Sequence, residues 1–149
     1  MKQEPGLTLI AKTVTRVSVW LIILYGIYII LHGHLSPGGG FAGGVVIALA
    51  FLNVMLTYGR ETVTHWVNVE FLHDLEPACG AIYMAIGILG ISISGGFSAN
   101  FLSKGTLFNL LSSGNILLLN IIIGIKVAMG LFTVVWTLAI FHINEGGEQ

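Results

Sequence analysis

Four long apolar stretches constrain this chain more than any other feature of its sequence. They cover residues of about 14–32, 41–58, 77–94 and 115–141, and each contains at most one charged side chain. A helix needs roughly 20 mostly apolar residues to cross a bilayer, because each residue rises about 1.5 Å through about 30 Å of hydrocarbon. The pattern predicts an all-α integral membrane protein with four transmembrane helices, forming a single domain over residues 1–149.

The composition agrees with this prediction and excludes several other classes of protein. Of the 149 residues, 55% are hydrophobic and 9% are charged, whereas soluble domains have about 25% charged residues. A soluble globular enzyme and a disordered tail are therefore excluded. The net charge of −1 leaves no basic face for nucleic acid. The single cysteine, Cys79, excludes an iron–sulfur cluster built by this chain alone, and no cofactor is expected.

The positive charges favour one orientation in the membrane. With four helices, both termini and the loop over residues 59–75 lie on one side. That side carries most of the cations, while the other two loops carry only Lys104. By the positive-inside rule, both termini are predicted to be cytoplasmic in a multi-pass protein of the cell membrane. The cations on that side are Lys2, Lys12, Arg16 and Arg60.

The residues that connect the first two apolar stretches, 33–44, predict a tight turn. Pro37 disfavours helical geometry at the residue before it, so the first helix should end there. Glycines four residues apart then let a neighbouring helix backbone come close. Either the turn lines an ion or water path with His34 handling protons, or it only packs the two helices; the residues favour packing. The glycines are Gly38, Gly39, Gly40, Gly43 and Gly44, with Phe41 among them.

Lys126 is the one charge deep inside an expected span. It lies eleven residues after Asn115 and fifteen before Phe141, so about 16 Å and about 22 Å separate it from the two helix ends. Its side chain cannot easily reach either surface. A charge at the bilayer centre costs at least roughly 2.5–3.5 kcal/mol, and some other group must offset that cost.

The sequence suggests no counter-ion for Lys126 within the chain. No expected span contains Asp or Glu, and Asp74 and Glu76 are placed at the cytoplasmic end of the third helix. Lys126 is therefore neutral, or faces a hydrated cavity, or meets a carboxylate of another polypeptide. A structural alternative is a lysine held by backbone carbonyls. We expect the partner of Lys126 to belong to another chain.

Several further residues are weaker candidates. Asn120 could share the polar surroundings of Lys126 on the same helix. Tyr83 follows Glu76 by seven residues, so both could lie on one face of the third helix. Asp74, Glu76 and Tyr83 are therefore candidates for a proton or ion site at the cytoplasmic end of that helix. Pro77 suits the first turn of the third helix. The spacing of His65, His73, Glu70 and Asp74 lacks a metal-ligand pattern, and no metal site is predicted. Small residues that flank Lys126 and favour packing are Gly124, Ala128 and Gly130.

Two strings are similar to motifs of a known family. Residues 33–44 resemble the pattern G-H-N-x-P-G-G-G-F-x-G-G, with Leu35 in place of the asparagine. Residues 105–130 resemble G-T-L-F-S-G-G…L-L-N…G-x-K-V-x-x-G-L, with Asn109-Leu110-Leu111 inserted after Phe108. On these motifs, over about two-thirds of its length, the chain resembles the MnhB/MrpB family. These are small four-helix subunits of Mrp-type sodium/proton antiporters, and related modules occur in membrane-bound hydrogenases and sulfane-sulfur reductases.

The resemblance implies a non-catalytic subunit of an Mrp-type Na+/H+ antiport module. Its partners would be other small membrane subunits and larger antiporter subunits resembling those of respiratory complex I, and its ions Na+ and H+. An alternative is the same module within a redox-driven complex, such as a membrane-bound hydrogenase or sulfane-sulfur reductase. An independent four-helix transporter and a pure scaffold are further alternatives. The family motifs match this chain at His34, Pro37, Phe41, Asn120 and Lys126.

Overall fold

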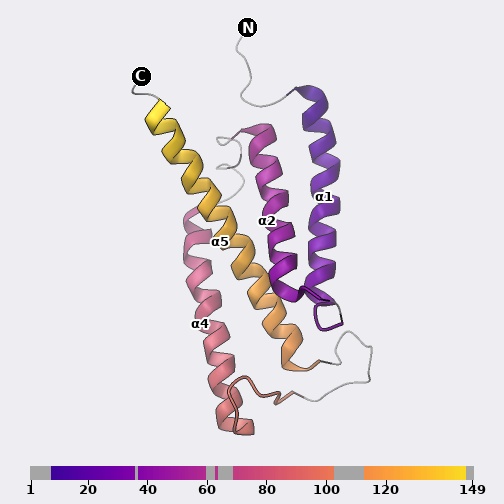
Figure 1. The fold of residues 1–149 in the computed structure, drawn as a ribbon, viewed down its shortest axis with the longest axis vertical. Coiled ribbons are helices and arrows are strands. Elements are labelled where there is room, and N and C mark those ends of the chain that lie inside the picture. The colour runs from indigo at the N-terminus through magenta and orange to yellow at the C-terminus, as the bar shows by residue number, and fades with distance from the viewer. Residues whose placement is uncertain (1–7, 36, 60–62, 64–68, 103–112, 147–149) are drawn as a thin grey trace.

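Four long helices make up the computed structural model (Figure 1). The structure describes residues 8–35, 37–59, 63, 69–102 and 113–146, without the side chains of 69–70 and 140–146. Each helix contains a segment long and apolar enough to cross a membrane, which confirms the predicted number of spans within these ranges. The helices are α1 (Leu9–Leu31), α2 (Gly39–Tyr58), α4 (Val69–Ser94) and α5 (Asn115–Gly146).

The largest difference from the predicted boundaries is at the start of α4. This helix begins at Val69, so Pro77 lies inside it, and the predictions of a loop up to residue 75 and of Pro77 in the first turn are wrong. Proline removes one backbone donor, and neighbouring helices allow a membrane helix to tolerate that loss. Acidic residues also favour the positive end of the helix dipole, and Asp74 lies near that end. The outer ends of α1 and α5 each extend about five residues beyond the predicted spans.

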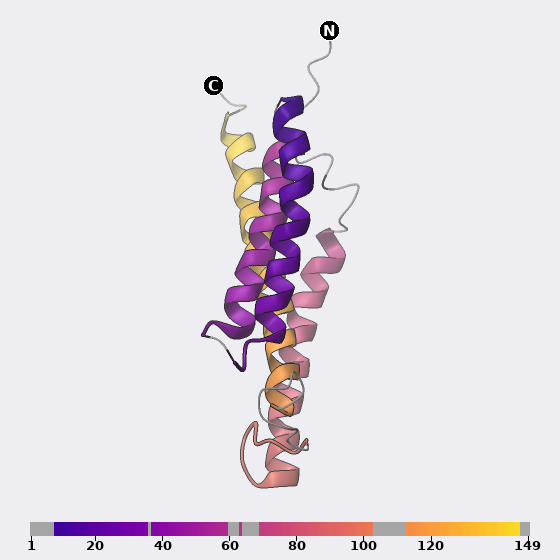
Figure 2. The same cartoon turned by 90° about the vertical axis from the view of Figure 1, so that its right-hand side faces the viewer.

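The helices are displaced along the long axis of the molecule. α1 and α2 lie side by side, α2 also packs against α5, and α4 packs mainly against α5. Both views show α4 shifted toward the end of the molecule away from the N-terminal end of α1 (Figures 1 and 2). The first turns of α4 therefore lie beside the middle of α5, which decides what Lys126 meets.

Glycines bring the backbones of α1, α2 and α5 into contact. A Cβ atom added at Gly43 would lie 2.8 Å from the carbonyl oxygen of Gly26 on α1. A Cβ atom added at Gly44 would lie 2.5 Å from the carbonyl oxygen of Gly124 on α5. Real Cβ atoms do not come this close to backbone atoms, so these positions exclude any larger residue. α2 thus presents Gly43 to α1, and Gly44 together with Gly40 to the backbone of α5.

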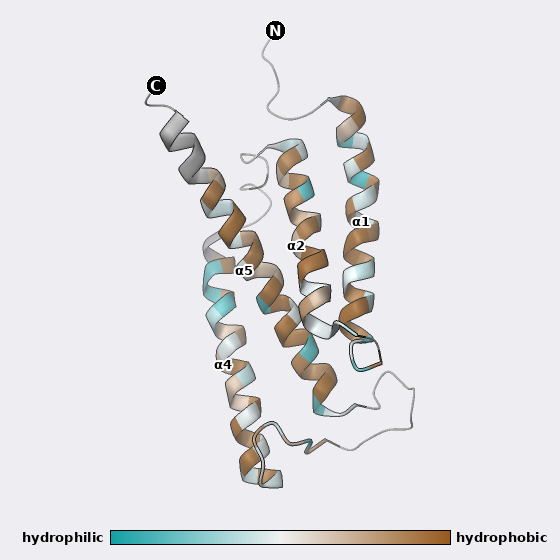
Figure 3. Ribbon diagram, viewed as in Figure 1, coloured by the Kyte–Doolittle hydropathy of each residue, from teal (hydrophilic) through white to brown (hydrophobic). Residues whose placement is uncertain are grey.

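The exterior of the bundle is mostly apolar. Brown, hydrophobic residues cover all four helices (Figure 3), and large side chains of α1 such as Trp20 and Leu24 are 72% and 66% exposed. Apolar exposure on this scale marks a surface for lipid or for another subunit. The buried core contains Met55, Val63, Phe132 and Trp136, which join α2 and α5 near one end of the bundle.

Substituting Gly44 is expected to separate α2 from α5. Gly44→Val would push a Cβ atom onto the carbonyl oxygen of Gly124 and should destabilise the fold by about 1–3 kcal/mol, the usual cost of overpacking. Denaturant unfolding of the purified chain in detergent measures this loss. Gly96→Ala is the control, because its Cβ would lie 3.6 Å from the nearest atom, Cβ of Ala99. Equal stability of both variants would contradict the close packing.

Candidate functional site

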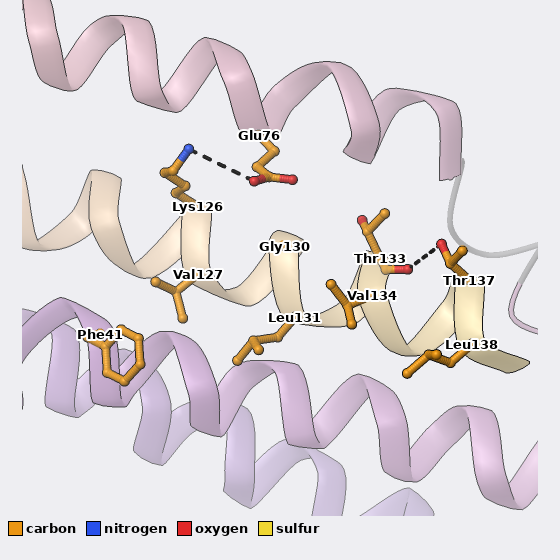
Figure 4. A pocket seen from close by; sticks show the side chains of 10 residues that line it. All are labelled: Phe41, Glu76, Lys126, Val127, Gly130, Leu131, Thr133, Val134, Thr137 and Leu138. Atoms are coloured by element: carbon orange, nitrogen blue, oxygen red, sulfur yellow. Dashed lines mark hydrogen bonds and ion pairs between the residues drawn. The ribbon is translucent and has the colours of Figure 1, made fainter.

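Lys126 of α5 faces Glu76 of α4 (Figure 4). The Lys126 Nζ and Glu76 Oε1 atoms are 3.9 Å apart, and the two side chains are 45% and 37% exposed. The expectation that this chain offers no counter-ion to Lys126 is therefore wrong. So is the premise that no span contains a carboxylate, since the apolar segment Phe71–Ser94 includes Asp74 and Glu76.

The displacement of α4 explains this error. The sequence places Glu76 at a helix end because the apolar run begins after it, whereas α4 begins seven residues earlier at Val69. Glu76 therefore lies about 10 Å inside the helix. Because the start of α4 lies beside the middle of α5, this depth brings Glu76 level with Lys126.

Two glycines make room for the ion pair, one on each helix. A Cβ atom at Gly80 of α4 would lie 3.3 Å from Lys126 Nζ, and one at Gly130 of α5 would lie 3.4 Å from Glu76 Oε1. Lys126 thus lies over Gly80, which is one turn after Glu76 on α4. Glu76 lies over Gly130, which is one turn after Lys126 on α5. A larger residue at either glycine would have to displace a charged group.

The ion pair lines a groove of about 600 Å³ on the surface of the bundle. Phe41 of α2 also lines the groove, on the other side of α5 from Glu76 and Lys126 (Figure 4). Thr133 and Thr137 continue the lining along the same side of α5. The Glu76–Lys126 groove, as we name it, is completed by Val127, Gly130, Leu131, Val134 and Leu138.

The geometry of the pair suits exchange of small cations or protons. Opposite charges offset part of the cost of placing either one in hydrocarbon. At 3.9 Å the two charged atoms are too far apart for a direct hydrogen bond, and both side chains are partly exposed to the groove. A carboxylate oxygen is a hard ligand that binds a proton or an alkali or alkaline-earth cation. The groove therefore combines a cation-binding group with a resident positive charge that competes for it.

Asn120 lies at a different place, against the glycine turn. Its side-chain oxygen accepts a hydrogen bond from the Gly40 amide at 3.4 Å. A Cβ atom at Gly33 would lie 2.8 Å from its side-chain nitrogen, and one at Gly39 would lie 3.2 Å from its side-chain oxygen. Gly38 and Gly39 adopt positive φ angles of 119° and 51°, which glycine permits at little cost. Asn120 therefore braces the turn that starts α2.

Asn120 and Lys126 point to different parts of the bundle. They are six residues apart on α5, which places them on different faces of a helix with 3.6 residues per turn. Asn120 faces the turn between α1 and α2, whereas Lys126 faces α4. His34 and Tyr83 are each half-buried, and Asp74 is exposed beside His73 at the start of α4. Of the residues singled out from the sequence, Asn120 therefore lies with the glycine turn, whereas Lys126 lies with Glu76 in the groove.

Some residues considered from the sequence lie outside the described ranges. These are Lys2, Arg60, His65, Lys104 and residues 105–112. Side chains that the sequence analysis missed include Thr133 and Thr137 of the groove, although their spacing from Lys126 by seven and eleven residues could have indicated a shared helix face. A buried polar cluster between α1 and α2 was also missed. The Thr15 and Thr57 hydroxyl oxygens lie 2.9 Å apart, so one donates to the other, and the second hydroxyl hydrogen is donated to Asn53 Oδ1, which lies 3.3 Å from Thr15 Oγ1 and 3.5 Å from Thr57 Oγ1.

Comparisons with known proteins agree on one family. Residues 10–133 match the family described as a domain related to the MnhB subunit of Na+/H+ antiporters. A Staphylococcus aureus protein named as a candidate antiporter subunit, mnhB2, is 33% identical over 85 residues, 57% of this chain and 54% of that protein. Protein MJ1307 of Methanocaldococcus jannaschii is 37% identical over 126 residues, 80% of this chain and 47% of that protein.

A solved structure shows the same arrangement of helices. It is a chain in the structure of the membrane-bound sulfane sulfur reductase, an archaeal respiratory membrane complex. The TM-score is 0.71 at 32% identity, covering 92% of this chain and 59% of that chain. The present chain thus spans about half the length of the curated relatives that it matches.

Filling the space at Gly80 is expected to uncouple Glu76 from Lys126. A double-mutant cycle of Glu76→Gln and Lys126→Gln should give a coupling of about 0.5–1 kcal/mol in the free energy of unfolding, as for a partly exposed ion pair. The coupling should vanish in a Gly80→Leu background, where the new side chain displaces Lys126 Nζ. Unfolding of the purified chain in detergent measures each variant.

Ala81→Leu serves as the control for this cycle, because Ala81 is the exposed neighbour of Gly80 on α4. It adds the same side chain away from the ion pair and should leave the coupling unchanged. A coupling that persists in the Gly80→Leu background would show that the two glycines do not position the charges.

Proposed function

Because the chain belongs to the MnhB family of Na+/H+ antiporter subunits, we propose that it is a non-catalytic membrane subunit of a multi-subunit Na+/H+ antiport module. The curated relative mnhB2 and the structural match to a chain of a respiratory membrane complex support membership of a larger assembly. The proposed partners are other small membrane subunits and larger antiporter subunits resembling those of respiratory complex I.

The Glu76–Lys126 groove is the part of this subunit that we assign to the ion path. The observation that carries the assignment is a half-exposed ion pair, 3.9 Å between Nζ and Oε1, deep within apolar helices. Ionisable residues at such depth mark ion and proton paths in membrane proteins. Protonation or cation binding at Glu76 would weaken its attraction for Lys126, so occupancy of the path and position of the lysine would be linked.

Thr133 and Thr137 continue the lining of the groove toward the end of the molecule where α1 begins (Figures 1 and 4). Thr137 donates its hydroxyl to the Thr133 carbonyl at 2.8 Å, and both line the groove. We place this end at the cytoplasmic face of the cell membrane, because Lys12 and Arg16 lie there and the positive-inside rule favours such a placement.

A second candidate is the same module within a redox-driven ion-pumping complex, in which electron transfer in other subunits drives ion movement. The structural similarity to a chain of the sulfane sulfur reductase complex favours it. In both candidates the role of this chain is the same, and the source of energy differs.

Removing either charge of the pair is expected to impair antiport in the assembled complex. Lys126→Ala and Glu76→Gln should each lower Na+-driven proton movement in inverted vesicles at least about tenfold, since each leaves one charge without its partner in the bilayer. Co-purification of the other subunits monitors assembly. Lys104→Gln, which removes a cation predicted to lie outside the spans, is the control and should retain antiport.

Normal antiport by a fully assembled Lys126→Ala complex would favour a pure scaffold instead. The energy source is tested separately by purifying the native assembly through this subunit. Vesicles that exchange Na+ for H+ with no electron donor support the antiporter, whereas Na+ movement that requires a reductant supports the redox-driven complex.

A further inference from the structure

A second cavity lies between α1 and α2, apart from the Glu76–Lys126 groove. Its volume is about 460 Å³, and no residue that lines it also lines the first groove. Its lining combines one cation, aromatic rings and apolar side chains. The residues of this interfacial cavity are Thr15, Arg16, Val19, Trp20, Val54 and Tyr58.

Contacts between the helices fix the level of this cavity along the bundle. The Tyr58 hydroxyl donates to the Lys12 carbonyl at 3.0 Å, and the Thr15 and Thr57 hydroxyls are 2.9 Å apart. The second turn of α1 is therefore level with the last turn of α2. The 20 residues of α2 extend about 30 Å, the thickness of the hydrocarbon layer. The end of α2, and with it Arg16, thus lies at a boundary of the membrane.

The chemistry of the cavity matches one end of a phospholipid. Arg16 is exposed, and its side chain forms no ion pair or hydrogen bond with any residue that the structure describes. A guanidinium group binds phosphate through two parallel hydrogen bonds. Trp20 follows one turn later, is 72% exposed, and has the amphipathic ring that occurs at headgroup level. Val19 and Val54 provide an apolar wall below the cation.

The charge of the cavity favours an anionic headgroup over a zwitterionic one. Its described lining contains Arg16 and no carboxylate. A choline or ethanolamine group would bring a second positive charge beside Arg16, whereas a glycerol headgroup would not. Basic pockets between membrane helices are known to hold anionic headgroups.

We propose that this interfacial cavity binds one anionic phospholipid, with its phosphodiester on Arg16 beside the Trp20 ring and one acyl chain along Val19 and Val54. The site does not depend on the proposed antiport function, because it uses none of the groove residues. Bound lipid would fill the space between α1 and α2 at the membrane boundary and add a contact to the exposed face of α1.

Native mass spectrometry of the full chain, released from nanodiscs of equal phosphatidylglycerol and phosphatidylcholine content, tests this proposal. We expect the wild-type chain to retain one phosphatidylglycerol in preference to phosphatidylcholine. Arg16→Gln should lower its retention at least about fivefold, and Arg16→Lys should lower it less because the charge remains. Lys104→Gln, which removes one positive charge elsewhere in the sequence, should leave retention unchanged.

A second variant separates loss of binding from loss of folding. Val19→Phe keeps every charge and fills the cavity, so it too should lower retention, while circular dichroism of all variants reports whether the helices are intact. Equal retention of both lipids by the wild-type chain would overturn the proposal. So would unchanged retention in Arg16→Gln, or cross-linking of Val19→Cys to a partner subunit within the intact complex.

Discussion

The charge of Lys126, deep within an apolar helix, is the constraint that the arrangement of α4 meets by placing Glu76 beside it. A lone charge near the middle of a membrane helix costs at least roughly 2.5–3.5 kcal/mol, and Lys126 lies too far from either end of α5 to reach water easily. The displacement of α4 along the bundle supplies the carboxylate at the same depth. Gly80 and Gly130 then provide the space that both side chains occupy. The displacement of α4, the pairing of the two charges and the space at the two glycines therefore all favour the same contact between α4 and α5.

α5 makes two different sets of contacts on two faces. One face holds Asn120 and Gly124 against α2, where the glycine turn and the backbone contact at Gly44 make a rigid joint. The other face carries Lys126 and the threonines of the groove. A helix fixed on one side by backbone contacts can hold a charged side chain in a partly open groove on the other side, because its axis is not free to shift.

The sequence predicts the four helices and singles out Lys126 as the charge that needs a partner, but it does not reveal that this partner is Glu76. Hydropathy locates the spans, and a charge within an apolar run is conspicuous without any structure. The position of Glu76 was misjudged because apolar runs mark where a helix enters hydrocarbon, whereas α4 starts eight residues before Pro77. The space at Gly80 and Gly130 depends on the register between two helices, which no spacing within one helix reveals. The close packing at the glycines of α2 can be predicted from the sequence, because their four-residue spacing lies within a single helix.

Cross-linking across the α4–α5 contact tests the placement of this ion pair most directly. In a Cys79→Ser background, paired cysteines at Gly80 and Lys126, and at Glu76 and Gly130, can be treated with a short bifunctional thiol reagent in native membranes of cells that produce the assembled complex. Both pairs should cross-link, because Lys126 Nζ lies 3.3 Å from a Cβ atom at Gly80 and Glu76 Oε1 lies 3.4 Å from one at Gly130, so the reagent spans the distance that the long side chain spans in the wild-type chain. A pair at Gly87 and Lys126, about two turns away on α4, should not react. Cross-linking of the Gly87 pair in preference to the other two would contradict the displacement of α4 and the ion pair that rests on it.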